Sequence, residues 1–155
     1  MDAAQTVVDT LSRYYFESEV FNRRATTELT PGECCSIMID AQKRTYGDAL
    51  NVDELHPYMW AVKGHYYGTD LAFYNYPYAF GQLFGMSLYA QYQRDGDAFC
   101  ERYVRLLELT GSESAETVTA SAGFDIETKD FWRMGISIIE GYIDEFCELA
   151  DEVLK

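Results

Sequence analysis

The sequence predicts an all-α fold, an irregular multi-helix domain of six or seven helices. Apolar residues recur in several segments at the spacing of one helix face. No segment of any length shows the apolar–polar alternation that is typical of a β-strand. Glycines and prolines stand where these helical patterns begin or stop, which is where helix boundaries are expected.

The first two helices have clear boundary signals. Apolar residues at helical spacing run from Val7 to Phe21, and this helix is expected to end around Thr26. The next helix begins at "TPGE" (residues 30–33), where the threonine is the N-cap and the proline is the first helical residue. The glutamate is placed to close a capping box, and Gly47 supplies the C-terminal stop.

The rest of the chain continues the helical pattern. A short turn of helix is expected to follow Pro57 and to stop at Gly64. The longest pattern spans residues 69–94 and includes Phe73, but Pro77 must kink that helix or mark its boundary. Three more helices are expected, over "AFCERYVRLLEL" between two glycines, over residues 115–122, and from about Lys129 onward.

Length and composition favour one folded unit. We expect residues 1–155 to form a single helical domain or fragment, because a chain of this length can bury a substantial core. A hydrophobic fraction of 48% and only three prolines argue against disorder. The net charge of −14 repels phosphate backbones and anionic lipid, so neither nucleic acid nor a membrane surface is an expected partner.

The four cysteines indicate a reducing compartment. Cys34, Cys35, Cys100 and Cys147 fit neither CxxC pairs nor a dense disulfide framework, and we interpret them as reduced thiols. No apolar run is long enough to span a bilayer, and no secretory leader opens the chain. The expected location is therefore the cytoplasm.

Sequence motifs alone identify no catalytic centre. The two histidines, His56 and His65, are nine residues apart and cannot form the imidazole pair of an HExxH zinc site. Neither a GxSxG elbow nor a glycine-rich phosphate loop is present. An independent hydrolase that uses His65 with a carboxylate such as Asp70 is one alternative from the residues alone.

Several linked segments resemble one family. "LTPGECCSIMIDAQKRTYGD", "HPYMWAVKGHYY", "FYNYPYAFG", "LYAQYQRDGDAF", "LLELTGSESAE" and "DFWRMG" occur in order and without large gaps. Together they resemble the carboxy-terminal part of oligoendopeptidase F, a zinc metallopeptidase family related to thimet oligopeptidase. The resemblance implies the C-terminal part of a zincin-type oligopeptidase catalytic domain that cuts short peptides in the cytoplasm.

The resemblance also implies a division of labour. In the family, the HExxH helix and the third zinc ligand, a glutamate, lie upstream of the region matched here. We therefore expect no cofactor to be bound by this chain, zinc to belong to the intact enzyme, and a short peptide to be the substrate. Surfaces that pack on the missing part are expected to mediate self-association, through the first helix or the helix containing Phe73 and Phe80.

The resemblance assigns roles to residues in the aromatic stretch. His65 matches the histidine of the family's cleft, and "FYNYPY" matches its aromatic motif. Tyr76 and Tyr74 are then the candidate donors to the oxyanion that forms during peptide hydrolysis, with the choice between them open. Tyr67 is expected to contact substrate, and Gly64 and Gly68 to let "HYY" move as the cleft closes.

Two interpretations of the remaining features stay open. A free-standing helical binding or assembly module, descended from such a peptidase and catalytically inactive, is the alternative function. Most other aromatic residues of this stretch are interpreted as packing; Tyr58, Trp60, Tyr78, Tyr89 and Tyr92 belong to this set.

Overall fold

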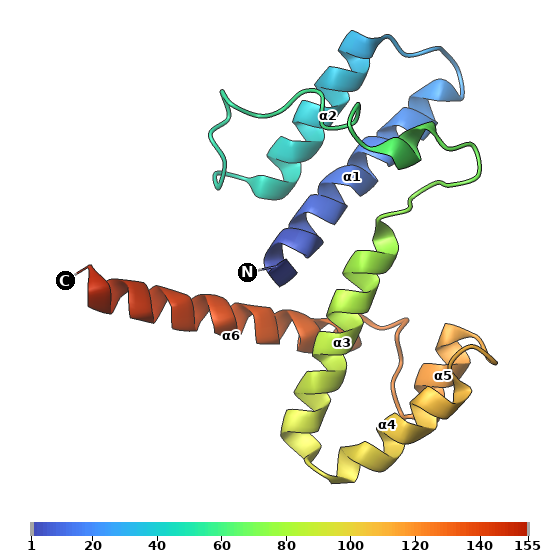
Figure 1. Cartoon of the computed structure of the whole chain (residues 1–155), viewed down its shortest axis with the longest axis vertical. Coiled ribbons are helices and arrows are strands. Elements are labelled where there is room, and N and C mark those ends of the chain that lie inside the picture. Colours follow the sequence, from blue (N-terminus) through green and yellow to red (C-terminus); the bar gives the residue numbers. More distant parts are fainter. Residues whose placement is uncertain (1, 155) are drawn as a thin grey trace. The chain divides into compact units, whose positions relative to one another are not determined.

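The computed structural model describes residues 2–154 and is entirely helical over that range (Figure 1). The described residues form six α-helices, one 3₁₀ helix and no strand, which confirms the all-α prediction. The elements are α1 (Asp2–Arg24), α2 (Pro31–Tyr46), η1 (Gly64–Tyr67), α3 (Tyr76–Asp95), α4 (Ala98–Leu109), α5 (Ala115–Ser121) and α6 (Lys129–Val153). None of these helices is both long and apolar enough to cross a membrane.

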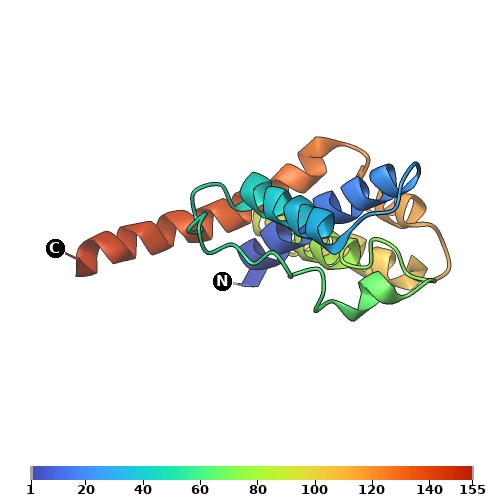
Figure 2. The ribbon, with the colours of Figure 1, turned by 90° about the horizontal axis from the view of Figure 1, so that it is seen from above.

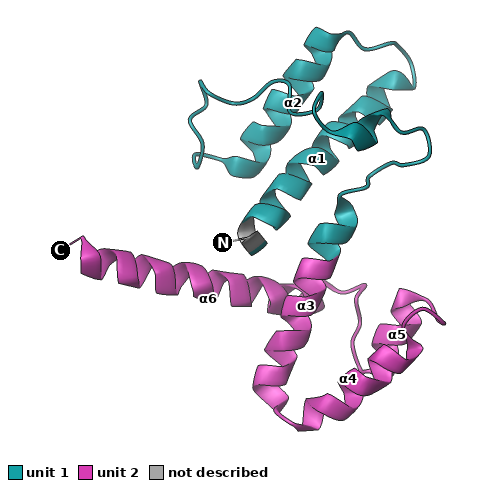
Figure 3. Ribbon diagram, viewed as in Figure 1, with its two compact units in different colours: residues 1–80 teal, residues 81–155 magenta. Residues whose placement is uncertain are grey.

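The chain divides into two compact units, residues 1–80 and residues 81–155 (Figure 3). The first unit contains α1, α2 and η1, and the second contains α4, α5 and α6. The boundary falls inside α3, whose first turn belongs to the first unit. Each unit has its own cluster of buried apolar side chains.

In the first unit, α1 and α2 lie side by side (Figures 1 and 2). The predicted capping box is present, since the Thr30 hydroxyl accepts from the Glu33 backbone and the Glu33 carboxylate accepts from the Thr30 backbone. Gly47 follows α2 with a φ of 55°, a conformation that favours glycine. The core between the helices consists of Phe16, Ile37, Met38 and Ala41, with Trp60 and Tyr66 packed against it.

The short turn of helix predicted after Pro57 is a run of hydrogen-bonded turns over residues 57–62 and not a regular helix. Gly64 begins η1 instead of ending a helix. The physical reason lies in α2, where the buried Gln42 amide bonds both backbone groups of His56, at 3.0 Å to the carbonyl oxygen and 3.3 Å from the N–H. These tertiary bonds hold His56 against α2, and the His56 carbonyl oxygen also accepts the Met59 N–H at 3.3 Å, which forms the first of the turns.

The helix predicted over residues 69–94 begins later than expected. Pro77 occupies the second position of α3, so it marks a boundary and does not kink the helix. Phe73, which the sequence pattern placed in that helix, has a φ of 53° and cannot be α-helical. Its backbone N–H donates to the Glu17 carboxylate of α1 at 2.9 Å.

In the second unit, the bounds of α4, α5 and α6 agree with the predictions to within a residue or two. The core gathers side chains from all four helical segments; its buried members are Leu88, Phe99, Leu106, Val118, Ala122, Phe124 and Phe131. α6 packs closely against α3 where Gly135 meets Ser87. The Ser87 hydroxyl, which is fully buried, donates to the Phe131 carbonyl oxygen at 2.8 Å.

Candidate functional site

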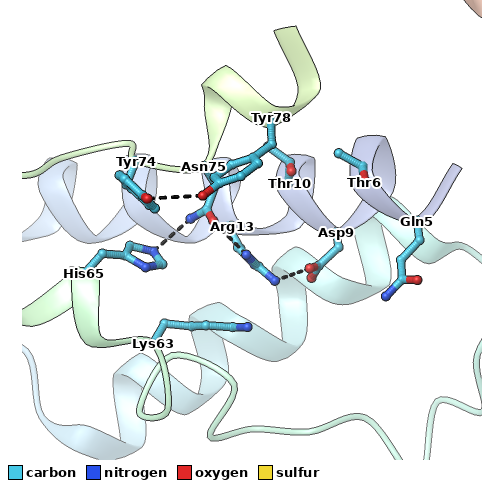
Figure 4. A pocket seen from close by; sticks show the side chains of 10 residues that line it. All are labelled: Gln5, Thr6, Asp9, Thr10, Arg13, Lys63, His65, Tyr74, Asn75 and Tyr78. Atoms are coloured by element: carbon cyan, nitrogen blue, oxygen red, sulfur yellow. Dashed lines mark hydrogen bonds and ion pairs between the residues drawn. The ribbon is translucent and has the colours of Figure 1, made fainter. Parts of the chain in front are cut away.

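A polar pocket of about 580 Å³ lies in the first unit and contains the predicted histidine (Figure 4). We call it the histidine pocket. One wall is a face of α1, and the other side comes from the residues around η1 and the start of α3. The lining residues are Gln5, Thr6, Asp9, Thr10, Arg13, Lys63, His65, Tyr74, Asn75 and Tyr78.

His65 is half-buried and stands among aromatic rings. Its ring centroid lies 4.3 Å from that of Tyr66 and 5.4 Å from that of Tyr74. Its Nε2 atom is 2.8 Å from Nδ2 of Asn75. Burial lowers the pKa of His65 below its ordinary value, and the positive charges of Arg13 and Lys63 lower this pKa further. Both effects favour the neutral form of the imidazole.

Tyr74 and Tyr78 form a hydroxyl pair at the pocket. The Tyr78 hydroxyl donates to the Tyr74 hydroxyl at 3.1 Å, and this hydrogen bond raises the pKa of Tyr78. A phenol that accepts one hydrogen bond keeps its own proton for another acceptor. Tyr74 is 42% exposed, so its hydroxyl proton is within reach of a ligand in the pocket.

A series of hydrogen bonds and an ion pair connects α1 to the histidine. Asp9 and Arg13 stand one turn apart on α1 and form an ion pair. Arg13 Nη1 donates to Oδ1 of Asn75 at 2.7 Å, and Asn75, only 4% exposed, meets His65 on its other side (Figure 4). These contacts join a face of α1 to the imidazole, and the Arg13–Asn75 hydrogen bond connects residues that are 62 positions apart in the sequence.

The structure brings together His65 and Tyr74 but not the other predicted site residues. Tyr76 is 60% exposed on the first turn of α3 and does not line the histidine pocket. Tyr67 is 62% exposed and donates to the Ala61 carbonyl oxygen at 3.1 Å. The roles assigned to these residues stay predictions.

The two predicted hinge glycines bracket η1. Gly64 is its first residue, and the backbone N–H of Gly68 donates to the His65 carbonyl oxygen at 3.3 Å, which closes the turn. Gly68 and Tyr67 line a second cavity rather than the histidine pocket. The hinge motion itself stays a prediction.

The second cavity, of about 830 Å³, also borders η1 and is mostly apolar. We call it the apolar cavity. Its apolar lining residues are Phe16, Val20, Phe21, Leu29, Trp60, Tyr66, Leu71 and Ala72. The indole N–H of Trp60 and the hydroxyl of Tyr66 are buried without a hydrogen-bond partner in the described part of the chain.

Asp70 and several aromatic residues differ from what the sequence suggests. Asp70 accepts a hydrogen bond from the neighbouring Thr69 at 2.7 Å, and within residues 2–154 no contact joins it to His65. Four tyrosines that were interpreted as packing residues are 44% to 56% exposed, so they are not core residues: Tyr58, Tyr78, Tyr89 and Tyr92. Trp60 does pack against the core of the first unit.

Zinc does not fit the donor set of the described residues. Residues 2–154 contain no group of three histidine, cysteine, aspartate or glutamate side chains close enough to share a metal ion. The four cysteines are free, and Cys100 and Cys147 are exposed. A step that needs bound zinc is therefore not assigned to this chain's own residues.

Three residues of the histidine pocket could not be found from sequence patterns. Arg13 looks like an ordinary solvated charge, and folding brings it to His65 from α1. Lys63 is two residues before His65, but no sequence pattern shows that it lines the same pocket. Asn75 carried one signal, because it is the single amide within "FYNYPY". An amide enclosed by aromatic residues needs buried hydrogen-bond partners, although the sequence does not say which ones.

Comparison with known proteins gives one relative. The chain is similar to oligopeptidase PepF of Bacillus subtilis (strain 168). The two are 26% identical over 125 residues, which cover 81% of this chain but only 18% of PepF. No protein-family model and no solved structure matches the chain. This distant similarity supports a relation to the oligopeptidases, and nothing finer.

Proposed function

We propose that this chain is the C-terminal segment of a zinc metalloendopeptidase that hydrolyses short peptides, and that it supplies substrate-binding and oxyanion-stabilising residues but no metal ligands. The observation that carries the proposal is the meeting of His65 and Tyr74 in one polar pocket. These two residues come from separate motifs of the segment that resembles the peptidases. The similarity to PepF supports the same relation.

The chemistry of the pocket suits a peptide carbonyl group. Hydrolysis places negative charge on the carbonyl oxygen, and fixed hydrogen-bond donors stabilise that charge more than they stabilise the ground state. Tyr74 supplies a phenol hydroxyl, a hydrogen-bond donor on a rigid side chain. The hydrogen bond from the Tyr78 hydroxyl holds the Tyr74 oxygen in place, so the Tyr74 proton is directed away from Tyr78. Tyr76 remains the second donor candidate.

Zinc enters this proposal only as a group of the intact enzyme, where it would polarise the carbonyl group. The residues of this chain then bind and orient the peptide and donate to its oxygen. Lys63 adds a positive charge to the pocket, where it lies close enough to lower the pKa of His65. A peptide carboxylate or backbone carbonyl oxygen is the complementary partner for such a set of donors.

A peptide titration tests the proposal on the chain itself. We expect a short unstructured peptide to shift the NMR signals of His65 and Tyr74 in a saturable manner. Tyr74→Phe should weaken this binding, whereas Tyr142→Phe, which removes an exposed hydroxyl from α6, should not. Peptide-induced shifts that avoid the histidine pocket, or no shifts at millimolar peptide, contradict the proposal.

The alternative is a catalytically inactive helical binding or assembly module. The apolar cavity favours it, because an apolar hollow of about 830 Å³ is suited to an apolar partner. The same titration separates the two functions. Shifts confined to Trp60 and Leu71 favour the module, and shifts at His65 favour the peptidase segment.

A further inference from the structure

We propose that Asn75, oriented by Arg13, fixes neutral His65 as the tautomer with its proton on Nδ1, so that the imidazole meets a ligand in the histidine pocket only as a hydrogen-bond donor. Asn75 is then a positioning residue, which acts through His65. The tautomer follows from the contacts of the first unit alone. Its use toward a peptide oxygen rests on the proposed function.

The contact with Arg13 fixes the orientation of the Asn75 amide. A guanidinium group has donors and no acceptor, so the amide atom 2.7 Å from Arg13 Nη1 must be the oxygen. A flipped amide would set its NH₂ group against the Arg13 N–H. The ion pair with Asp9 holds Arg13 from its other side, and Asn75 is too deeply buried to exchange Arg13 for water.

The contact with Asn75 determines which ring nitrogen of His65 carries the proton. With its oxygen on Arg13, Asn75 turns its NH₂ group toward Nε2 of His65, at 2.8 Å. The NH₂ group can only donate, so Nε2 must be the unprotonated acceptor and the ring proton must sit on Nδ1. An imidazolium would oppose two N–H groups and lose this hydrogen bond.

The charges around the ring act in the same direction. Arg13 and Lys63 are the cations that face His65, and Asp9 is already engaged by Arg13. The other titratable neighbours are the phenols of Tyr66 and Tyr74, whose rings lie against the imidazole. No carboxylate in the described part of the chain forms an ion pair with His65 that could favour its charged form.

This assignment limits what His65 can do. Nε2 is occupied by Asn75, so it is closed both to a proton from water and to a metal ion. Nδ1 has no hydrogen-bond partner within residues 2–154, and its N–H is the only donor of the ring. In the proposed peptidase segment, His65 therefore acts as a neutral donor to a carbonyl oxygen and not as a general base.

The chain contains its own reference for a test. His56 accepts the Tyr58 backbone N–H through Nδ1 at 3.1 Å, so neutral His56 must carry its proton on Nε2. Long-range ¹H–¹⁵N correlation spectra of imidazole-labelled protein distinguish the two tautomers, and His56→Gln assigns the signals. Slightly above neutral pH we expect opposite tautomers at the two histidines. A charged His65, or one protonated mainly on Nε2, overturns the proposal without any variant.

A second measurement tests Asn75 directly. Asn75→Asp replaces the donor beside Nε2 with an acceptor, so we expect the proton to move to Nε2 and the pKa of His65 to rise by roughly 1–3 units. Asn75→Leu removes the donor at similar volume and should allow a mixture of both tautomers. The matched control is Asn51→Asp, which adds the same charge on an exposed loop and should change neither property. An unchanged His65 tautomer in both Asn75 variants contradicts the positioning role.

These spectra need neither substrate nor zinc, so they separate this inference from the proposed function. If the Nδ1–H tautomer is found but peptides leave His65 unaffected, the positioning role stands and the peptidase function fails. If peptides bind at His65 but the proton sits on Nε2, the peptidase function stands and the tautomer assignment fails.

Discussion

At the scale of single residues, the candidate site is a set of hydrogen-bond donors gathered around one imidazole. His65 and Tyr74 are predicted from the resemblance, and folding places their rings 5.4 Å apart. Tyr76 is predicted from the same motif, but it points its ring to solvent at the start of α3. Of the two candidates, we therefore propose Tyr74 ahead of Tyr76 as the oxyanion donor.

A pair of hydroxyl deletions tests this ranking. In a zinc-loaded peptidase that contains this segment, Tyr74→Phe should lower kcat by about 10²–10³ and leave KM nearly unchanged, because the lost bond forms mainly in the transition state. Tyr76→Phe should have a smaller effect, and each change removes almost no volume. Steady-state kinetics with a fluorogenic peptide measures both. Should both variants turn over within a few-fold of the parent enzyme, these tyrosines have no catalytic role.

Sequence patterns could not predict the contact between Arg13 and Asn75. Sequence patterns find residues that are close along the chain or that match a known motif. Arg13 is 62 residues away from Asn75 and belongs to none of the motifs that carry the resemblance. Their contact depends on how the segment after η1 returns to α1, and local spacing carries no information about that path.

Glu17 gives a pH-dependent test of this return path. Burial raises the pKa of Glu17 above its ordinary value of about 4.5, while the hydrogen bond from the Phe73 N–H opposes that rise. The folded state thus binds a proton more readily than the unfolded state. The stability that protonated Glu17 contributes is fully present below about pH 4.5, and it is lost as the pH rises through the pKa of Glu17 in the folded state.

We therefore expect Glu17→Gln to stabilise the first unit near neutral pH, because glutamine keeps an acceptor for Phe73 without a buried charge. The difference in free energy of unfolding should vanish at acidic pH. Glu17→Ala is the control, since it removes the acceptor and should destabilise at every pH by about 1 kcal/mol. Denaturation curves across this pH range measure these effects, and a Gln variant that is less stable near neutral pH contradicts the argument.

At the scale of elements, local sequence signals set most helix bounds. The Thr30–Glu33 capping box, the proline at the start of α3 and the glycine after α5 all occur where the sequence predicts a boundary. The failures occur between residues 47 and 75, where Gln42 and Glu17 bond the backbone of the loop. There tertiary hydrogen bonds decide the conformation, and periodicity cannot reveal them.

The contact of α6 with α3 provides a matched pair of glycine variants. A Cβ atom at Gly135 would lie 2.5 Å from the Leu83 carbonyl oxygen and 2.8 Å from the Ser87 hydroxyl. Gly135→Ala should therefore lower the free energy of unfolding of the second unit by about 1–3 kcal/mol. Gly141→Ala, on the same helix with nothing within 4 Å, should raise it by up to about 1 kcal/mol. Equal effects in thermal denaturation contradict close packing at Gly135.

At the scale of the whole molecule, the chain's own residues predict no zinc chemistry. The sequence lacks HExxH, and residues 2–154 hold no cluster of three metal-binding side chains. We expect the isolated chain neither to retain zinc nor to cleave peptides. Metal analysis after dialysis and a fluorogenic peptide assay test this. Near-stoichiometric zinc, or turnover that survives repurification, contradicts the expectation.

The strongest candidate surface for self-association is on α6. Sequence reasoning expected it on the first helix or on the helix containing Phe80, and α1 does expose Phe21 at 54%. The second half of α6, however, carries a longer exposed apolar stripe at helical spacing: Tyr142, Ile143, Phe146, Leu149 and Val153, each 49% to 85% exposed. Contiguous apolar patches of this kind tend to find partners.

Phe146→Glu should therefore reduce self-association in light scattering at moderate concentration, because it places a charge within the apolar stripe. Val104→Glu is the matched control, since it adds the same charge at an exposed apolar position of α4. Added salt should strengthen association of the parent chain, because it screens repulsion between molecules of net charge −14. A strict monomer at high concentration and high salt, or equal effects of both substitutions, would show that the α6 stripe is not an association surface.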